Sequence, residues 1–373
     1  MATKSTIITS PDGAAWTVRA NPWDTPSAPV GQGVATDGST VVAVAEHSTA
    51  VPVIESSPDG IAWTSRTSGL DTFGGGKCVC WGSASSLFVA GGAASSSAST
   101  VPLIVTSPTG TTWTTRLNAP GGGGTFCQVN AVVAMGSIVV AGGAAVMLDA
   151  STPFGFSPLA YSTDGGVTWT VVPAANHPFV EAGPAFASVL GLATDGTTIV
   201  AVGFGGLHFA PVIATSTDGF NWAAGSLPAG CNPSSVAWDG THWVLGDNGS
   251  DPLSIAVSTS PGSGYSLVSS PYDNNSVDGI GYSSDLSQWA AVGYQGGTQV
   301  VATAGANPSG TWTAQTTPAD SSGSEFFGVV WVHSLGLWVA VGEGIAPQTG
   351  GWLLGGISAS PTFPTGWHTG ATP

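Results

Sequence analysis

One short pattern recurs along the chain about every 50 residues, and it limits the possible folds more than any other feature. A serine, an aspartate, a glycine and a tryptophan keep their order in each well-formed copy. These copies are Ser10–Trp16, Ser57–Trp63, Ser107–Trp113 (with Thr109 in place of the aspartate), Ser162–Trp169 and Ser216–Trp222. Degenerate copies end at Tyr265, Trp312 and Trp367. A period of this length is typical of arrays in which each repeat is one supersecondary unit.

An apolar hairpin lies between successive copies of the pattern. Its clearest forms are Val34–Val44, Leu192–Val202 and Val236–Leu245, in which Asp-Gly separates two apolar runs. Asp-Gly flanked in this way is the strongest short-range hairpin signal. Because the runs are almost wholly apolar, we expect strands that are buried on both faces. Related hairpins are Val79–Ala90, Val132–Ala141, Ile280–Val292 and Val329–Val341.

Each repeat therefore supplies an inner and an outer hairpin, which predicts an all-β chain and a β-propeller of four-stranded antiparallel blades. We expect residues 1–373 to form one propeller domain. Seven inner hairpins and eight outer copies favour seven blades, with the N- and C-terminal outer hairpins meeting at the closure of the ring. Eight blades is the alternative.

The Ser-x-Asp-x-Gly-x-x-Trp pattern resembles the Asp-box, or bacterial neuraminidase repeat, of sialidase-like propellers. The aspartate is expected to accept backbone N–H groups in the turn, the glycine to allow a positive φ, and the aromatic ring to pack between blades. A residue repeated in every unit serves the repeated fold. The structural residues are accordingly Asp12, Trp16, Asp59, Trp63, Trp113, Asp164, Trp169, Asp218 and Trp222.

The resemblance implies a sialidase fold without its catalytic residues. Sialidases hold the substrate carboxylate with three arginines, and this chain has only Arg19, Arg66 and Arg116. Each of them stands three residues after a repeat tryptophan, so all three are expected on outermost strands, where they cannot converge on one pocket.

Other chemistry also lacks a clear signal. A glycosidase of another kind needs two suitably spaced carboxylates, and the candidates are Glu46, Asp71, Glu181, Asp247, Asp320, Glu325 and Glu343. The six histidines lack metal-ligand spacing, and no phosphate-binding loop or nucleophile elbow is present. We therefore expect no enzyme activity, no cofactor and no metal, with a glycoside hydrolase as a lesser alternative.

Charge and segment composition limit the partners and the compartment. The net charge is −16 with five basic residues, which disfavours nucleic acid and anionic membranes. No apolar run is long enough to span a membrane, and the N-terminus has no secretory signal. The four cysteines, Cys78, Cys80, Cys127 and Cys231, are expected to stay reduced in a cytoplasm.

Binding is expected on the propeller face that carries the connections between hairpins and between blades, because loops on a rigid scaffold usually carry function. Aromatic side chains beside Asn and Asp suit sugar rings as well as protein surfaces. About half of these aromatic residues are expected to cap the propeller core instead. The candidate ligand-binding residues are Trp23, Asp24, Phe73, His177, Phe179, Glu181, His208, Phe209, Tyr272, Asn274, Asn275 and Glu325.

Composition adds a hint about biology. Only 7% of the residues are charged and 55 are glycine, which is similar to bacteriophage virion proteins such as tail fibres, tail-tip proteins and capsid decorations. The leading hypothesis is a binding or structural propeller of a virion, made in the host cytoplasm, that contacts other virion subunits and recognises a host-surface glycan or protein. A cellular protein-interaction scaffold is the alternative.

Overall fold

The computed structural model describes residues 3–23, 29–47, 53–71, 75–96, 99–118, 126–146, 157–179, 186–206, 209–248, 253–273, 275–296, 298–318 and 325–345. These parts of the chain are almost entirely β-structure. Two short 3-10 turns, Ala174–Asn176 and His333–Leu335, are the helical elements within them. The copy of the repeat that ends at Trp367 lies outside the described residues.

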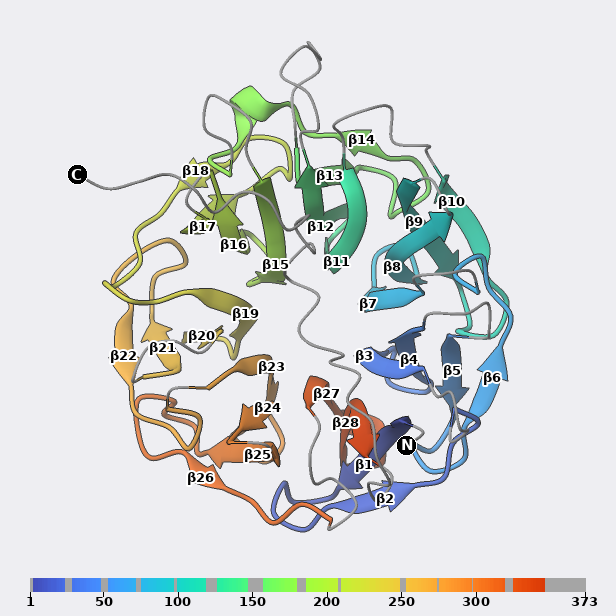
Figure 1. The fold of residues 1–373 in the computed structure, drawn as a ribbon, viewed down its shortest axis with the longest axis vertical. Helices are drawn as coiled ribbons and strands as arrows, with labels where there is room; N and C mark the ends of the chain where they lie inside the picture. Colours follow the sequence, from blue (N-terminus) through green and yellow to red (C-terminus); the bar gives the residue numbers. More distant parts are fainter. Residues whose placement is uncertain are drawn as a thin grey trace, which may run out of the picture.

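The 28 strands form groups of four that radiate from a common centre (Figure 1). The innermost strands are β3 (Val30–Thr36), β7 (Gly76–Gly82), β11 (Phe126–Met135), β15 (Phe186–Thr194), β19 (Pro233–Trp238), β23 (Val277–Ser283) and β27 (Phe326–Val332). The second strands are β4 (Val41–Glu46), β8 (Leu87–Ser96), β12 (Ile138–Val146), β16 (Ile199–Gly205), β20 (Trp243–Asp247), β24 (Gln288–Gln295) and β28 (Leu337–Ile345).

The outer hairpins complete each group. Their third strands are β5 (Ile54–Ser57), β9 (Ser99–Ser107), β13 (Leu159–Ser162), β17 (Ala210–Ser216), β21 (Ile255–Ser258), β25 (Thr298–Ala304) and β1 (Thr3–Ser10). The outermost strands are β6 (Thr64–Arg66), β10 (Thr114–Asn118), β14 (Thr170–Val171), β18 (Ala223–Ala224), β22 (Ser266–Val268), β26 (Thr313–Ala314) and β2 (Thr17–Arg19). We number the groups blade 1 (β3–β6) to blade 6 (β23–β26) along the chain, and blade 7 is β27, β28, β1 and β2.

All strand pairs within the blades are antiparallel, as the hairpin signals predict. Blade 7 closes the ring, because β1 from the start of the chain pairs with β28 over Thr3–Ser10 and Ile345–Trp338. Each innermost strand also contacts the innermost strand of the next blade, and β27 contacts β3. Blades 3 and 4 are joined further by a short ladder between β12 and β15.

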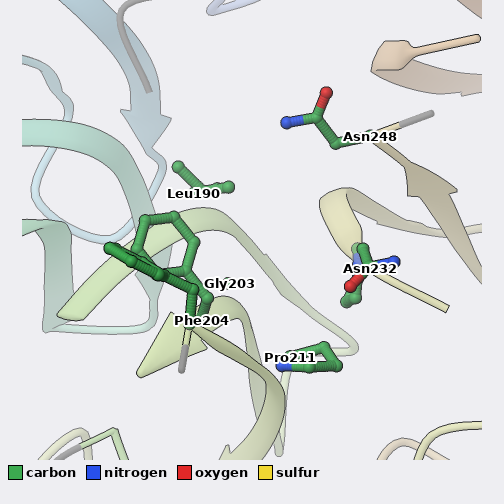
Figure 2. A pocket seen from close by; sticks show the side chains of 8 residues that line it. Leu190, Gly203, Phe204, Pro211, Asn232 and Asn248 are labelled. Atoms are coloured by element: carbon green, nitrogen blue, oxygen red, sulfur yellow. The ribbon is translucent and has the colours of Figure 1, made fainter. Parts of the chain in front are cut away.

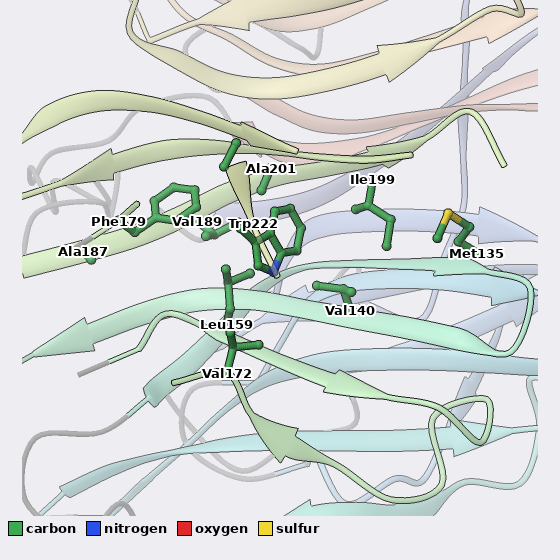
Figure 3. Close-up of a cluster of buried hydrophobic side chains, with 11 residues drawn as sticks. Met135, Val140, Leu159, Val172, Phe179, Ala187, Val189, Ile199, Ala201 and Trp222 are labelled. Atoms are coloured by element: carbon green, nitrogen blue, oxygen red, sulfur yellow. The ribbon is translucent and has the colours of Figure 1, made fainter. Parts of the chain in front are cut away.

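The core consists of apolar clusters between neighbouring blades rather than one central cluster. Figure 3 shows the cluster between blades 3 and 4, where Val140 and Leu159 of blade 3 meet Val189 and Ile199 of blade 4. Trp222 of the outer hairpin packs into this cluster. One repeat aromatic contributes in the same way to each of the other clusters: Trp16, Trp63, Trp113, Trp169, Tyr265 and Trp312.

The repeated aspartate organises the turn before each of these aromatic residues. Asp12 Oδ1 accepts the N–H groups of Ala14 and Ala15 at 2.9 and 3.0 Å, and Ser10 Oγ accepts Gly13 N at 2.9 Å. The backbone N–H of Ala15, then that of Ala14, holds the pKa of Asp12 below its usual range. Asp59, Asp164 and Asp218 accept the equivalent bonds. The repeated side chains are therefore structural.

Candidate functional site

Every inner hairpin has a β-bulge near the start of its innermost strand. The register shifts by one residue there, so one residue of the innermost strand has no partner in the ladder, and β11 has a second shift earlier in the strand, at Cys127. Bulges re-aim a side chain and are common beside functional sites. Each unpartnered residue is half-buried, and together they form what we call the bulge ring: Gln32, Lys77, Asn130, Leu190, Ser234, Asp278 and Phe327.

Close backbone packing fixes the position of the bulge ring. A Cβ atom on Gly33 would lie 3.2 Å from Lys77 O of the next blade, and one on Gly279 would lie 2.7 Å from Phe327 O. Gly191 and Gly328 approach the following bulge in the same way. The backbone is thus nearly the same at each junction, whereas the bulge side chain differs. Variation on this fixed frame is what a binding surface requires.

Most polar members of the bulge ring bond to a neighbouring blade. Lys77 Nζ lies 2.8 Å from Glu46 Oε2 of blade 1. Asn130 Nδ2 donates to Ser188 Oγ of blade 4 at 3.0 Å, and Ser234 Oγ donates to Val277 O of blade 6 at 3.1 Å. These bonds join neighbouring blades on one face of the propeller. We call it the link face, because the connecting segments enter the innermost strands there.

The junction between blades 6 and 7 holds a cluster of carboxyl groups. Ser276 Oγ lies 3.0 Å from Asp278 Oδ2 and 2.9 Å from Glu325 Oε1. Desolvation, and then the nearby Glu325 carboxylate, raise the pKa of Asp278 well above its usual range. The same two causes raise the pKa of Glu343. Because one hydroxyl can donate only one hydrogen bond, a proton retained by the carboxyl pair supplies the second bond.

Two members of the bulge ring, Leu190 and Phe327, are apolar and cannot form such a bond, and Leu190 lies at the junction between blades 4 and 5. A pocket of about 110 Å³ opens there (Figure 2). Asn232 and Asn248 lie across this pocket from Leu190 and Phe204. None of its described lining residues is charged: Leu190, Gly203, Phe204, Phe209, Pro211, Asn232, Pro233 and Asn248.

Phe209 is the unusual residue of this pocket. Its φ is +52°, which a bulky side chain rarely adopts, and 40% of its surface is exposed. An edge contact with Phe204, with ring centroids 5.5 Å apart, supports the ring in this position. Backbone strain of this kind costs about 1–3 kcal/mol and concentrates at ligand-binding sites.

Asn232 and Asn248 form one wall of the pocket, and hydrogen bonds donated by their backbone N–H groups hold it in place. Asn248 N donates to Asn232 O at 3.0 Å, and Asn232 N donates to the buried Asp247 carboxylate at 2.5 Å. These two bonds pin the start of β19 to the end of β20. The two amide groups are therefore fixed on a rigid element rather than on a free loop.

Several candidate residues from the sequence belong to the core instead. The side chains of Trp23, Phe179 and Tyr272 are almost fully buried within the clusters between blades. His177 is buried as well, and this desolvation lowers its pKa to about 4, so its ring is neutral. These four side chains therefore lie inside the propeller and not on a binding surface.

Three candidates lie on the link face. Phe209 lines the pocket between blades 4 and 5, and Glu325 belongs to the carboxyl cluster. Asn275 accepts Gly296 N through its side chain at 3.2 Å, so it supports a turn of blade 6. The remaining candidates, Asp24, Phe73, Glu181, His208 and Asn274, lie outside the described residues.

The site also contains residues that the sequence did not single out. Leu190, Phe204 and Asn232 stand in apolar or loop segments that carry no motif. A usable signal exists, because a glycine directly follows the bulge residue in Gln32-Gly33, Leu190-Gly191 and Phe327-Gly328. Asp278-Gly279 has the same pattern, but Cys78, Ala131 and Ser235 follow the bulge residue in the other three strands, so the glycine marks only part of the bulge ring.

The arginines are in the positions expected from the repeat. Arg19, Arg66 and Arg116 lie on β2, β6 and β10, and each Nε donates to a hydroxyl on the adjacent strand at 2.7 to 2.8 Å. They do not converge on a pocket. Two histidines bind aspartates in hairpin turns, His242 to Asp239 and His333 to Asp285. The described residues contain no cluster of three or more groups suited to a metal ion.

The remaining carboxylate candidates have structural partners or lie outside the described parts. Glu46 binds Lys77, Asp71 accepts Ser68 N at 2.6 Å, and Asp247 accepts Asn232 N. Glu181 and Asp320 lie outside the described residues. Cys78 and Cys80 are free thiols. Desolvation raises the pKa of Cys80 to about 12, so this thiol is inert.

Four-stranded antiparallel blades around a common centre define the chain as a β-propeller. No helix in the described residues is long and apolar enough to cross a membrane. The fold is similar to a chain in the crystal structure of a nidogen/laminin complex, with a TM-score of 0.41 and 11% identity over 68% of this chain and 89% of that one. It is also similar to a putative gluconolactonase, with a TM-score of 0.47 and 8% identity over 85% and 91% of the two chains. No protein-family model and no curated protein sequence matches the chain.

Proposed function

We propose that this chain is a non-catalytic binding propeller of a bacteriophage virion, which recognises a glycan on the host surface through its link face. The observation that carries this proposal is the bulge ring, in which one backbone device presents a different side chain at each junction. The scaffold is constant and the chemistry varies, as in other binding folds that graft sites onto a rigid frame.

The virion assignment rests on composition and on the scarcity of cations. The chain has 7% charged residues and a net charge of −16, and it resembles virion proteins in this respect. A tail fibre, a tail tip or a capsid decoration would contact other virion subunits and leave the link face for the host. Mass spectrometry of particles purified from lysates of the source organism should find the chain. Its confinement to the soluble cell fraction would favour the cellular interaction scaffold.

The glycan assignment rests on the side chains at the open junction, where exposed aromatic surface lies beside amide groups. Labelled protein applied to a panel of immobilised bacterial and animal glycans should bind a subset of them. Binding to a host envelope protein, with no glycan bound, would replace the glycan by a protein receptor.

The carboxyl cluster is the feature nearest to catalytic chemistry, and its geometry suits hydrolysis poorly. Glycosidases hold two carboxyl groups about 5–5.5 Å or 6.5–9.5 Å apart. Asp278 and Glu325 both contact the same hydroxyl, that of Ser276, and desolvation raises the pKa of Asp278 well above its usual range. Glycans that bind should therefore be recovered intact after long incubation. Turnover abolished by Asp278→Asn or Glu325→Gln would show a hydrolase instead.

A further inference from the structure

We infer that the pocket between blades 4 and 5 is a subsite for one ring of a neutral sugar, stacked on Phe209. This inference rests on the proposed glycan-binding function and adds the place and the class of sugar. It begins from a comparison of equivalent junctions. Asn130, Ser234 and Asp278 reach a polar group of the next blade, whereas Leu190 leaves its junction open.

The conformation of Phe209 favours a functional role over a packing role. A core phenylalanine would be buried and would avoid a positive φ, but this ring is 40% exposed and its φ is +52°. Among the described residues, three besides glycines have a positive φ, and Phe209 is the aromatic one; the others are Ser86 and Ser287. A ligand ring that covers the exposed face of Phe209 would explain why the chain keeps this strained conformation.

The opposite wall supplies the polar half of a sugar site. The primary amide of Asn248 has a donor and an acceptor, and a sugar hydroxyl is likewise both. Beside it, Asn232 Nδ2 donates to Gly230 O at 3.3 Å, which orients the second amide of the wall. A pyranose ring has an apolar face for Phe209 and equatorial hydroxyl groups at its rim. An aliphatic side chain of a protein partner would offer no hydrogen bond to the Asn248 amide, which is costly on burial.

Charge selects among sugars. The lining has no cation, and the nearest carboxylate, Asp247, already accepts Asn232 N. With a net charge of −16 on the whole chain, a sugar carboxylate would be repelled. The pocket volume also limits the ligand, because about 110 Å³ is well below the roughly 300–1,000 Å³ of pockets for drug-sized ligands. We therefore expect one neutral ring at the end of a chain or on a branch.

The test compares binding of neutral and acidic glycans by the wild type and by two variants. Phe209→Gly removes the ring and also relieves the positive φ, so the variant should fold at least as well as the wild type. The matched control is Tyr294→Ala, which removes another exposed aromatic ring from the link face, on blade 6. Thermal unfolding establishes that each variant is folded before binding is measured.

We expect Phe209→Gly to weaken binding of a neutral glycan by roughly tenfold or more, which corresponds to about 1.4 kcal/mol, while Tyr294→Ala leaves it unchanged. Glycan binding that survives Phe209→Gly, or that is restricted to acidic sugars, would overturn the subsite and leave the proposed function standing. A wild type that binds no glycan would overturn the proposed function itself.

Discussion

At the scale of single residues, the repeat aspartate allows a reciprocal test. Thr109 stands where Asp59 stands one blade earlier, and its hydroxyl accepts a long backbone bond, from Thr111 N at 3.4 Å, beside a 2.6 Å bond with the Thr111 hydroxyl. Asp59 Oδ1 accepts two backbone N–H groups at 2.8 Å. We expect Asp59→Thr to destabilise the fold by about 1 kcal/mol and Thr109→Asp to stabilise it by a similar amount.

Urea unfolding of the two variants beside the wild type measures both changes. Because the two turns have the same design, the effects should be opposite in sign. Equal destabilisation by both substitutions would mean that local packing, rather than the carboxylate, decides the stability of the turn.

Glu55 gives a pH-dependent prediction. This carboxyl group is fully buried on β5 and accepts Trp23 N at 2.9 Å. Desolvation raises its pKa from 4.5 to about 8. Between these values the folded chain keeps the proton while the unfolded chain releases it, so stability falls as pH rises through this window.

Glu55→Gln keeps a neutral acceptor for Trp23 N and removes the titration. Melting temperatures of the wild type and this variant should therefore agree near pH 5 and diverge by pH 8, with the variant the more stable protein. A constant difference at every pH would show that Glu55 does not titrate in this range.

At the scale of elements, four of the seven bulge residues are followed by a glycine that packs against the next blade. A Cβ atom on Gly279 would lie 2.7 Å from Phe327 O and 3.2 Å from Gly328 Cα, and backbone cannot give way cheaply. Gly279→Ala should therefore destabilise blade 6 against blade 7 by about 1–3 kcal/mol.

Gly305→Ala is the matched control, because nothing lies within 4 Å of the added methyl group. Its effect on the unfolding midpoint should be close to zero or slightly stabilising. If Gly279→Ala proves equally harmless, the innermost strands are less tightly packed at the bulge ring than the structure indicates.

The hairpins were predictable from sequence and the bulges were not. Asp37-Gly38 and its relatives form the expected turns, with Asp37 Oδ1 accepting Ser39 N and Thr40 N at 2.7 Å. A bulge inside a largely apolar strand leaves no break in the apolar pattern, so Leu190 reads as an ordinary core residue. The alternation that would reveal a shifted register is absent from such strands.

The same limit explains the aromatic candidates that lie in the core. Trp23 and Tyr272 stand beside Asn or Asp in connecting segments, which is also how a binding loop reads. In a propeller these segments run over the ends of apolar clusters, so their aromatic rings fill the space between blades. The sequence alone places an aromatic residue near the link face. It does not show whether the ring points into the core or toward the solvent.

At the scale of the whole molecule, the carboxyl cluster lies at a junction of the closing blade. Asp278 of blade 6 and Glu325 of blade 7 both contact the Ser276 hydroxyl there, with Glu343 nearby. Because the pKa of Asp278 is raised by folding, the folded chain loses stability as pH rises above the usual range of an aspartate. Asp278→Asn imitates the protonated form.

We expect Asp278→Asn to raise the unfolding midpoint at pH 8 and to leave it unchanged near pH 4, where Asp278 already holds its proton. Chemical denaturation at both pH values measures the difference. A variant less stable than the wild type at pH 8 would mean that the ionised carboxylate strengthens the junction.

Closure of the ring depends on a strand from the opposite end of the chain. β1 covers the edge of β28 along its whole length, and its Ile7 and Ile8 are fully buried in the clusters on the two sides of blade 7. Removal of residues 1–20 would expose that edge and open both clusters. An exposed edge of this kind pairs with other chains, so the truncated protein should form oligomers in size-exclusion chromatography.

A synthetic peptide of residues 1–20, added during refolding, should restore the monomer because it supplies the missing hairpin. The matched control peptide carries Ile7→Ser and Ile8→Ser, which keep the backbone bonds and remove the apolar contacts, and it should fail to restore the monomer. A truncated chain that stays monomeric and unfolds at the wild-type midpoint would show that pairing between β1 and β28 contributes little to closure. Rescue by both peptides would assign closure to the backbone ladder rather than to the buried isoleucines.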